Sequence, residues 1–210
     1  MRLQKIEPRH YAWLDPNDQC LYYGDYTSGG GFEASDTNRQ ILNLKKKPTA
    51  KQGELYYKEK AVTYWGATLR KLLTLENTQA GYTFVPMPGS KPLGHPEYDD
   101  RMHRVLQHMR AGIQGVDVRP LLKQVKDRAA QHEGAGRMSP TDLCKTLAVD
   151  HSLIPPPVAS TIVVVDDVIT MGASFAAAKS MLMPLPNVTR VVGVFLAKTI
   201  WQTPDFDDDF

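Results

Sequence analysis

The clearest hydrophobic pattern in the sequence lies between residues 55 and 75. Its apolar side chains recur every three or four positions, at Leu55, Val62, Trp65, Leu69, Leu72 and Leu73. A period near 3.6 residues places such side chains on one face of a helix. We therefore expect an amphipathic helix that ends near Asn77 and packs against a sheet.

A different pattern, a continuous run of β-branched residues, occurs from Thr161 to Val165. Such a run is typical of a strand that is covered on both faces, as in a parallel sheet. Helix formers dominate residues 173–182, and a second apolar run covers residues 188–197. The order strand, loop, helix, strand predicts an α/β protein with a mainly parallel sheet flanked by helices.

Weaker patterns complete the expected core. Residues 82–88 are typical of a short buried strand that prolines bring to an end. A second helix is expected from Pro96, whose missing N–H suits a first helical turn. Residues 116–122 are typical of a strand or an extended segment, and we expect Ser139 to cap a short helix.

The first part of the chain, residues 1–53, has no regular hydrophobic period, and we expect short strands and loops there. We interpret it as a small N-terminal hood that precedes a core at residues 54–210. Tyr22, Tyr23 and Tyr26 in this hood are candidates for stacking on a base. The alternative is that these tyrosines pack a small core, as they more often do in short strands.

Composition narrows the class of protein only a little. Of the 210 residues, 42% are hydrophobic and 23% are charged, as in an ordinary globular protein. Lysine plus arginine number 25 and aspartate plus glutamate 23, which leaves a net charge of +2. This charge gives no support for a nucleic acid or an anionic membrane as partner, although it leaves a local basic patch open.

The expected location follows from segments that the sequence lacks. The N-terminal residues have no apolar run with a cleavage site, and no apolar stretch approaches the ~20 residues that cross a bilayer. Cys20 and Cys144 form no Cys-x-x-Cys pair, so neither a zinc ribbon nor a disulfide framework is indicated. We expect a soluble cytoplasmic protein with no membrane partner.

Candidate chemistry gathers directly after the β-branched run, at Asp166 and Asp167. In an open parallel sheet, ligands bind beyond the carboxyl ends of the strands. If the chain turns there, both carboxylates can approach the hydroxyls of a ligand or its bound cation. The alternative is that the two acids are polar residues that only end a strand.

The next residues, Thr170 to Ser174, are mostly small or hydroxyl-bearing and lead into the expected helix. A helix N-terminus favours an anion, because its first N–H groups have no backbone partner and its dipole is positive there. This segment therefore predicts a phosphate site beside the two acids. An ordinary helix cap at Ser174 is the alternative.

The ordered string from Ile162 to Ser174 resembles the phosphoribosyl-pyrophosphate signature of the type I phosphoribosyltransferases. The resemblance covers about residues 82–200 and implies the fold of that family. A looser similarity links residues 131–149 to the ComF and amidophosphoribosyltransferase-like branch, but the paired-cysteine zinc ribbon of ComF proteins is absent.

The resemblance assigns roles within the signature. It implies that Asp166 and Asp167 face the ribose hydroxyls and hold Mg²⁺, and that these two acids and Lys91 are the catalytic residues. The implied 5′-phosphate site consists of Thr170, Met171, Gly172, Ala173 and Ser174. Met171 departs from the threonine or alanine often found there.

Two further segments resemble the parts of the family that bind pyrophosphate. Ser90 and Lys91 correspond to the pyrophosphate loop, for which an ordinary surface turn is the alternative. The polar stretch at residues 123–138 resembles the family's flexible lid and is expected to be a mobile loop. Its basic residues are Lys123, Lys126, Arg128, His132 and Arg137. Of these, Arg137 is the candidate pyrophosphate ligand.

Asp99, Asp100 and Arg101 lie near the start of the second expected helix. Acids at that place stabilise a helix N-terminus through its dipole. Two interpretations are left open, an exposed charge cluster and a contribution to the site.

The function that this resemblance implies is a Mg²⁺-dependent transfer of the phosphoribosyl group from phosphoribosyl pyrophosphate to an unidentified small-molecule acceptor, usually nitrogenous. Thr170 stands where purine-salvage members carry an aspartate, which argues mildly against a purine. The alternative is a non-catalytic protein on the same fold that senses phosphoribosyl pyrophosphate or a nucleotide, or assists DNA handling. The sequence leaves open whether the protein is a homodimer.

Overall fold

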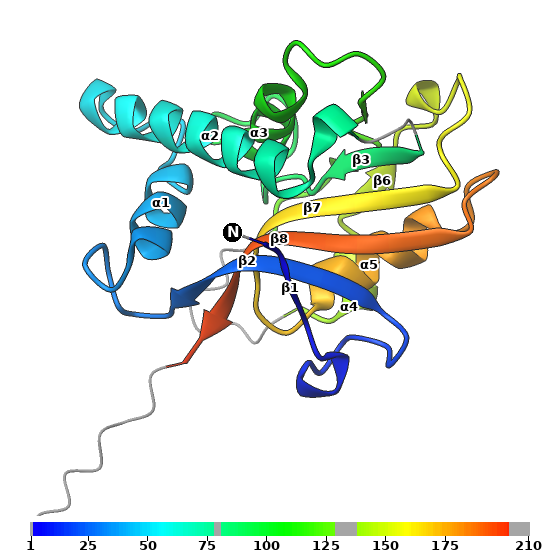
Figure 1. Cartoon of the computed structure of the whole chain (residues 1–210), viewed down its shortest axis with the longest axis horizontal. Helices are drawn as coiled ribbons and strands as arrows, with labels where there is room; N and C mark the ends of the chain where they lie inside the picture. The colour runs from blue at the N-terminus through cyan, green and yellow to red at the C-terminus, as the bar shows by residue number, and fades with distance from the viewer. Residues whose placement is uncertain (1, 78–80, 129–137, 202–210) are drawn as a thin grey trace, which may run out of the picture.

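A sheet of six strands forms the centre of the protein in the computed structural model, which describes residues 2–77, 81–128 and 138–201 (Figure 1). The strand order is β1-β2-β8-β7-β3-β4, and every neighbouring pair is parallel except β1 with β2. The strands of this sheet are β1 (Gln4–Lys5), β2 (Gln19–Thr27), β3 (Tyr82–Pro86), β4 (Asp117–Val118), β7 (Thr161–Ile169) and β8 (Arg190–Ile200).

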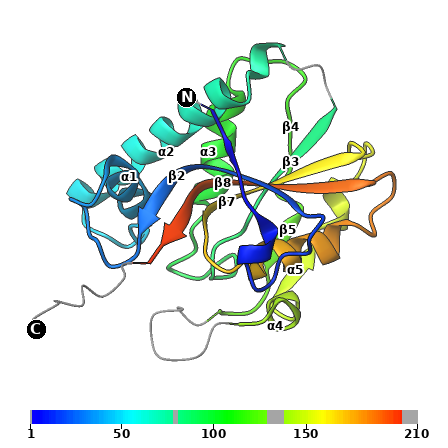
Figure 2. The ribbon, with the colours of Figure 1, turned by 60° about the horizontal axis from the view of Figure 1, so that its bottom comes forward.

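Helices cover both faces of the sheet (Figures 1 and 2). One face carries α1 (Asp36–Leu44), α2 (Gln52–Leu72) and α3 (Arg101–Arg110). The other face carries α4 (Pro140–Cys144), α5 (Ala173–Leu182) and an antiparallel pair, β5 (Leu122–Gln124) with β6 (Leu147–Val149). Single 3-10 turns lie at Pro8–His10, Leu75–Asn77 and His151–Leu153. The predicted α/β architecture, a mainly parallel sheet flanked by helices, is confirmed.

The β-branched run occupies β7, which packs on both sides. Ile162 and Val164 belong to the core beneath α5, whereas Val163 and Val165 belong to the core beneath α1, α2 and α3. Successive side chains of a strand point to opposite faces, so a strand between two helical layers needs apolar residues at every position. The sequence pattern therefore identified this strand correctly.

The expected end of β7 at Val165 is wrong, because the strand continues to Ile169. The neighbouring β8 is eleven residues long and keeps pairing with it, with Asp166 opposite Phe195 and Ile169 opposite Lys198. Asp166 and Asp167 are thus strand residues and not turn residues. Their side chains leave the backbone in opposite directions and meet different neighbours.

The N-terminal segment supplies more regular structure than the sequence indicated. β2 runs parallel to β8, from the pair Gln19 and Val192 to the pair Thr27 and Ile200. The helix α1 was not expected, although Ser35 is an N-cap whose hydroxyl accepts a hydrogen bond from the N–H of Asn38 at 3.0 Å. The division into a hood at 1–53 and a core at 54–210 stays a prediction, and β1 and β2 of the first segment are part of the main sheet.

Of the other helices expected from the sequence, two are confirmed and one begins later than expected. The long helix α2 is confirmed, and so is α4, whose cap Ser139 accepts a hydrogen bond from Asp142 N–H at 3.2 Å. Pro96 does not start a helix: α3 begins at Arg101, whose N–H donates to the side chain of Asp99 at 3.1 Å. None of the helices in the described ranges is long and apolar enough to cross a membrane.

The expected loop at residues 123–138 is partly ordered. β5 reaches Gln124 and pairs with β6, so the first residues of the stretch are a strand. Residues 129–137, which include the candidate ligand Arg137, lie outside the described residues.

Candidate functional site

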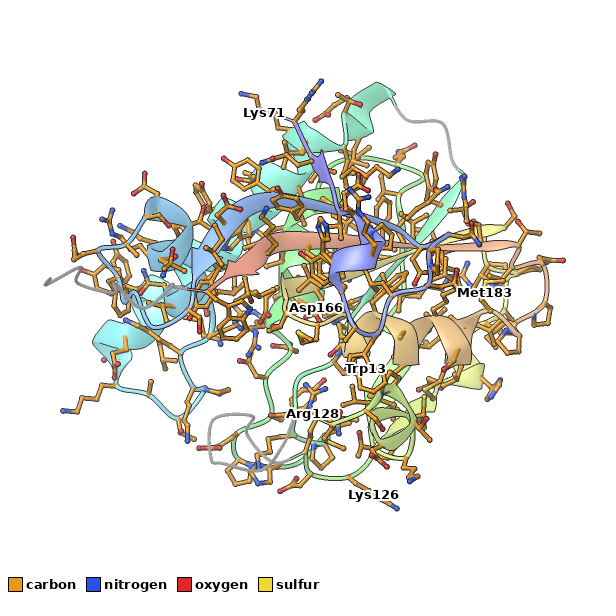
Figure 3. The ribbon with its side chains drawn as sticks, turned by 90° about the horizontal axis from the view of Figure 1, so that it is seen from below. Trp13, Lys71, Lys126, Arg128, Asp166 and Met183 are labelled. Atoms are coloured by element: carbon orange, nitrogen blue, oxygen red, sulfur yellow. The ribbon has the colours of Figure 1, made fainter. Side chains whose placement is uncertain are left out.

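A cavity of about 340 Å³ lies beyond the carboxyl ends of β3 and β7. Segments far apart in the sequence line it: residues 87–90 after β3, residues 166–174 at the end of β7, and Arg128 from the chain after β5. Figure 3 labels three of the lining residues, Trp13, Arg128 and Asp166, which come from three separate segments. The cavity occupies the place where a parallel sheet binds its ligands.

Most of the predicted site residues line this one cavity. They are Ser90, Asp166, Asp167, Thr170, Met171, Gly172, Ala173 and Ser174. Lys91 is not among the lining residues, because its ammonium forms an ion pair with Asp127 at 3.1 Å. The structure thus brings together the acids, the turn into α5 and the loop after β3, and it leaves Lys91 outside the lining.

Asp167 is buried and held by two cations. One carboxylate oxygen accepts hydrogen bonds from Nε and Nη2 of Arg101 at 3.0 and 2.7 Å, and the other lies 3.2 Å from the ammonium of Lys45. Burial raises the pKa of this carboxyl, but Lys45 and Arg101 outweigh burial and lower it below its ordinary value. Asp167 is therefore ionised at any physiological pH.

The pKa of Asp166 is shifted in the opposite direction from that of the adjacent Asp167. Burial, together with the charge of Asp167, raises the pKa of Asp166 to about 6. Among the described residues, the hydrogen bond to its carboxylate comes from the backbone N–H of Asp167 at 2.8 Å. Asp166 is thus the member of the pair that is open to a ligand, and its charge changes near neutral pH.

The two cations that hold Asp167 belong to a longer buried network. Arg101 also bonds Asp99 at 2.8 Å, and Asp99 accepts a hydrogen bond from the buried ammonium of Lys58 at 2.8 Å. Lys58 donates in addition to the carbonyl of Leu44, the last residue of α1. The interpretation as an exposed cluster holds for Asp100 but is wrong for Asp99 and Arg101, since these two take part in the network that fixes α1, α2 and α3 to β7.

The turn between β7 and α5 is shaped by Gly172. Its φ of +87° is in the left-handed region, and a Cβ atom there would lie 2.7 Å from Cδ2 of Leu14. The backbone N–H of Trp13 donates to the carbonyl of Met171 at 3.1 Å. The N-terminal segment therefore holds the turn in place, and the residues that begin α5, Ala173 and Ser174, line the cavity.

Arg128 lines the cavity, and its guanidinium lacks a full set of hydrogen-bond partners among the described residues. Its backbone N–H donates to the carbonyl of Ser90 at 2.9 Å, which fixes the chain after β5 against the loop after β3. The side-chain Nη1 is buried without a hydrogen-bond partner among the described residues. Burial lowers the pKa of Arg128, with Asp166 opposing that shift. A buried unpaired donor is costly, and an anion in the cavity would pair with it.

The fit of a Mg²⁺ ion depends mainly on Asp166. Within the described ranges, no three His, Cys, Asp or Glu side chains gather where they could hold a metal ion by themselves. Mg²⁺ is often held by only one or two carboxylates together with waters and substrate phosphates. Asp166 satisfies that requirement, whereas both oxygens of Asp167 are already engaged by Arg101 and Lys45.

The tyrosines proposed for stacking on a base are placed mostly in the core. Tyr22 is buried and donates a hydrogen bond to Gln4 at 3.0 Å, and Tyr23 packs edge-on against Trp65 with ring centroids 5.8 Å apart. Tyr26 lies under the ammonium of Lys45, at 5.8 Å from the ring centroid. The core-packing alternative therefore applies to all three, since Tyr26, like Tyr23, packs against the core beneath α1, α2 and α3.

Sequence reasoning missed Lys45 and Trp13 as lining residues. Lys45 is the first of three consecutive lysines in the sequence, residues 45–47. Its place directly after α1 brings it to the end of β7. Trp13 carried no local signal, because its position depends on the contact with Met171. No protein-family model matches the sequence, and no curated protein matches it either.

Proposed function

We propose that this protein has the type I phosphoribosyltransferase fold and binds phosphoribosyl pyrophosphate in the cavity beyond β3 and β7. One observation carries the proposal: a single cavity is lined by an Asp-Asp pair, by the start of a helix behind a glycine turn, and by an arginine whose buried Nη1 has no hydrogen-bond partner among the described residues. These three features match the three parts of the ligand, which are a sugar diol, a monophosphate and a diphosphate.

The sugar and its 5′-phosphate are assigned to β7 and α5. The carboxylate of Asp166 accepts hydrogen bonds from the ribose hydroxyls, and Asp167 positions the strand end through Arg101 and Lys45. The 5′-phosphate binds the N–H groups at the start of α5, where the helix dipole favours an anion. The hydroxyls of Thr170 and Ser174 add donors to the same phosphate.

The pyrophosphate is assigned to the other side of the cavity. The guanidinium of Arg128 pairs with its oxygens, and the loop at Ser90 supplies backbone and hydroxyl donors. When bound, Mg²⁺ neutralises part of the negative charge on the ligand, and Asp166 is the residue that would hold it. Lys91 reaches this group only if its ion pair with Asp127 opens.

In the proposed reaction, the bond between C1 of the ribose and the pyrophosphate oxygen breaks, and a bond from C1 to the acceptor nitrogen forms. Pyrophosphate leaves with the electron pair of the broken bond, and the proton of the acceptor nitrogen passes to solvent water. The residues of the chain position the reactants and stabilise charge: Arg128 acts on the leaving group and Asp166 on the sugar. The acceptor is a small nitrogenous molecule.

Pyrophosphate release tests this function directly. The protein is incubated with phosphoribosyl pyrophosphate, Mg²⁺ and a panel of nitrogenous bases, and released pyrophosphate is measured. We expect release with at least one base, and loss of release in Asp166→Asn/Asp167→Asn with an unchanged far-UV spectrum. Full activity of the double variant would rule out the proposed site.

A second candidate function is a non-catalytic sensor of phosphoribosyl pyrophosphate or a nucleotide on the same fold. Two observations favour it: both oxygens of Asp167 are occupied by cations, and Lys91 is turned to Asp127. A sensor would bind phosphoribosyl pyrophosphate in calorimetry but release no pyrophosphate with any base. Catalytic turnover with any acceptor would exclude this alternative.

A further inference from the structure

A group of exposed rings and lysines lies around α1 and the first turns of α2, and none of its members is a lining residue of the cavity. We call it the α1–α2 patch and define it by Phe32, Lys46, Tyr56, Tyr57 and Lys60. The three rings are 42%, 55% and 52% exposed, respectively. In Figure 1 this end of α2 projects beyond the sheet. Large aromatic side chains gathered on a surface commonly mark an interaction site.

The rings and the lysines of the patch contact each other. The ammonium of Lys46 lies 5.8 Å from the centroid of Phe32 and 5.1 Å from that of Tyr57, and Lys60 lies 4.5 Å from that of Tyr56. Tyr56 and Tyr57 meet edge to face, with centroids 5.5 Å apart. Cation–π contacts hold each charge beside a ring, so that the surface offers both together.

The patch also concentrates positive charge. Residues 45–60 contain six lysines and two glutamates, a net of +4, whereas the whole chain carries +2. Lys58 is buried with Asp99, which leaves five lysines on the surface. Both glutamates have partners within the fold: Glu59 pairs with Arg104, and Glu54 accepts a hydrogen bond from the N–H of Lys51 at 3.4 Å.

Three of these lysines have no carboxylate partner in the described parts of the chain. Lys46, Lys51 and Lys60 form no salt bridge with a described acid, whereas Lys47 pairs with Glu97 at 2.7 Å. Most surface lysines of a nearly neutral protein are interspersed with acids. Here the acids are engaged elsewhere, so the cations face solvent beside the rings.

We infer that the α1–α2 patch binds single-stranded nucleic acid. Phosphates pair with lysines, and unstacked bases lie on aromatic rings, which is the combination that single-strand binding surfaces use. Duplex DNA would engage the lysines but leave the rings unused, because its bases are stacked inside the helix. An acidic polypeptide would likewise form ion pairs with the lysines but would place nothing on the aromatic rings.

The inference is independent of the function proposed for the cavity. Lys46 of the patch follows Lys45, which lines the cavity, but no residue of the patch is itself a lining residue. Loss of phosphoribosyl pyrophosphate binding would leave strand binding intact, and the reverse also holds.

Fluorescence anisotropy of the full chain with a labelled oligothymidylate of about 20 nucleotides tests the inference. We expect saturable binding at low salt, at least about fivefold tighter than binding of a duplex of the same length. Affinity should fall as salt rises, with a slope of about −0.7 per phosphate contact in a logarithmic plot.

Matched variants separate the patch from general surface charge. Tyr57→Leu keeps an apolar side chain but removes the stacking face, and should weaken binding about five- to tenfold. Lys46→Gln should weaken binding and make the salt slope shallower by about 0.7. The controls are Tyr82→Leu, an exposed tyrosine of β3, and Lys71→Gln, an exposed lysine at the far end of α2 (Figure 3).

The inference is supported if both patch variants lose affinity and both controls keep it. It is overturned if the wild-type chain shows no saturable binding at low salt. It is also overturned if the duplex or polyglutamate binds as tightly as the single strand, or if Tyr57→Leu and Tyr82→Leu behave alike. Circular dichroism of each variant confirms that it is folded.

Discussion

The guanidinium of Arg101 holds a single carboxylate oxygen of Asp167 from two nitrogens, at 3.0 and 2.7 Å. The contact joins the first residue of α3 to Asp167, which lies near the carboxyl end of β7. Because an uncompensated buried charge is costly, removing either Arg101 or Asp167 destabilises the fold. Asp167 therefore acts by fixing the strand end, and the adjacent Asp166 is left to interact with a ligand.

Replacing Arg101 should destabilise the protein. We expect Arg101→Gln to lower the free energy of unfolding by about 2–3 kcal/mol, because it leaves Asp167 and Asp99 with one cation each in a buried site. Urea denaturation measures the change. Arg104→Gln, which breaks a more exposed pair with Glu59, is the control and should cost less than about 1 kcal/mol.

Asp166 should make stability depend on pH. Its pKa is about 6 in the folded protein and near 3.9 in an unfolded chain, so the folded state holds the proton more tightly. Stability contributed by this proton is present below pH 4 and is lost as pH rises through 6. We expect Asp166→Asn to stabilise the protein by about 1–2 kcal/mol at pH 7.5 and to have no effect below pH 4.

Asp166→Asn should bind phosphoribosyl pyrophosphate more weakly than the wild type at pH 7.5, although it is more stable there. Thermal denaturation at the two pH values, followed by ligand titration at pH 7.5, measures both effects on one sample. Equal stability of wild type and Asp166→Asn at pH 7.5 would show that the carboxylate is not desolvated as described. Substitution of the exposed acid Asp36 by asparagine provides the control, since its side chain is 86% exposed.

Gly172 should tolerate no side chain. Gly172→Ala forces a Cβ within 2.7 Å of Leu14 at a φ of +87°, so both strain and overlap contribute. We expect a loss of about 2–3 kcal/mol in the free energy of unfolding, together with loss of phosphate binding. In Gly94→Ala, the φ of +90° is similar but nothing lies within 4 Å, so the cost should stay near 1 kcal/mol.

Arg128 should matter for ligand binding and little for folding. Arg128→Met removes a buried donor without a described partner and fills its volume with an apolar side chain, so stability should be unchanged or slightly higher. Affinity for phosphoribosyl pyrophosphate should fall about 10- to 100-fold, since a charged hydrogen bond is lost. Lys126→Gln, an exposed cation two residues earlier, should leave affinity within about twofold.

The sequence alone was enough to predict that a strand occurs at β7 and a helix at α5. Their patterns are local: a β-branched run at 161–165 needs only its own residues to indicate a strand between two layers, and helix formers follow it. The length of β7 was not predictable in the same way. It depends on β8, which pairs with β7 from Arg190 to Lys198, so a polar Asp-Asp pair stays within the strand.

The candidate site could be predicted in part. Asp166 and the turn at Gly172 were identified because the chemistry lies in one continuous string. Lys45 and Arg101 were not assigned to Asp167, because the three residues meet only through the packing of α1 and α3 on β7. Lys91 was assigned from its place after β3, and its pairing with Asp127 depends on a chain segment that sequence cannot position.

Calorimetric titration of phosphoribosyl pyrophosphate with Mg²⁺ into the wild-type chain and Asp166→Asn tests the central claim most directly. We expect the wild type to bind with a Kd below about 1 mM and Asp166→Asn at least about tenfold more weakly. Wild-type affinity should rise from pH 5 to pH 7 as Asp166 ionises through its pKa of about 6, and the variant should show a smaller rise, because only the phosphates of the ligand ionise there. No binding by the wild type at millimolar ligand, or equal binding by both proteins, would contradict the account.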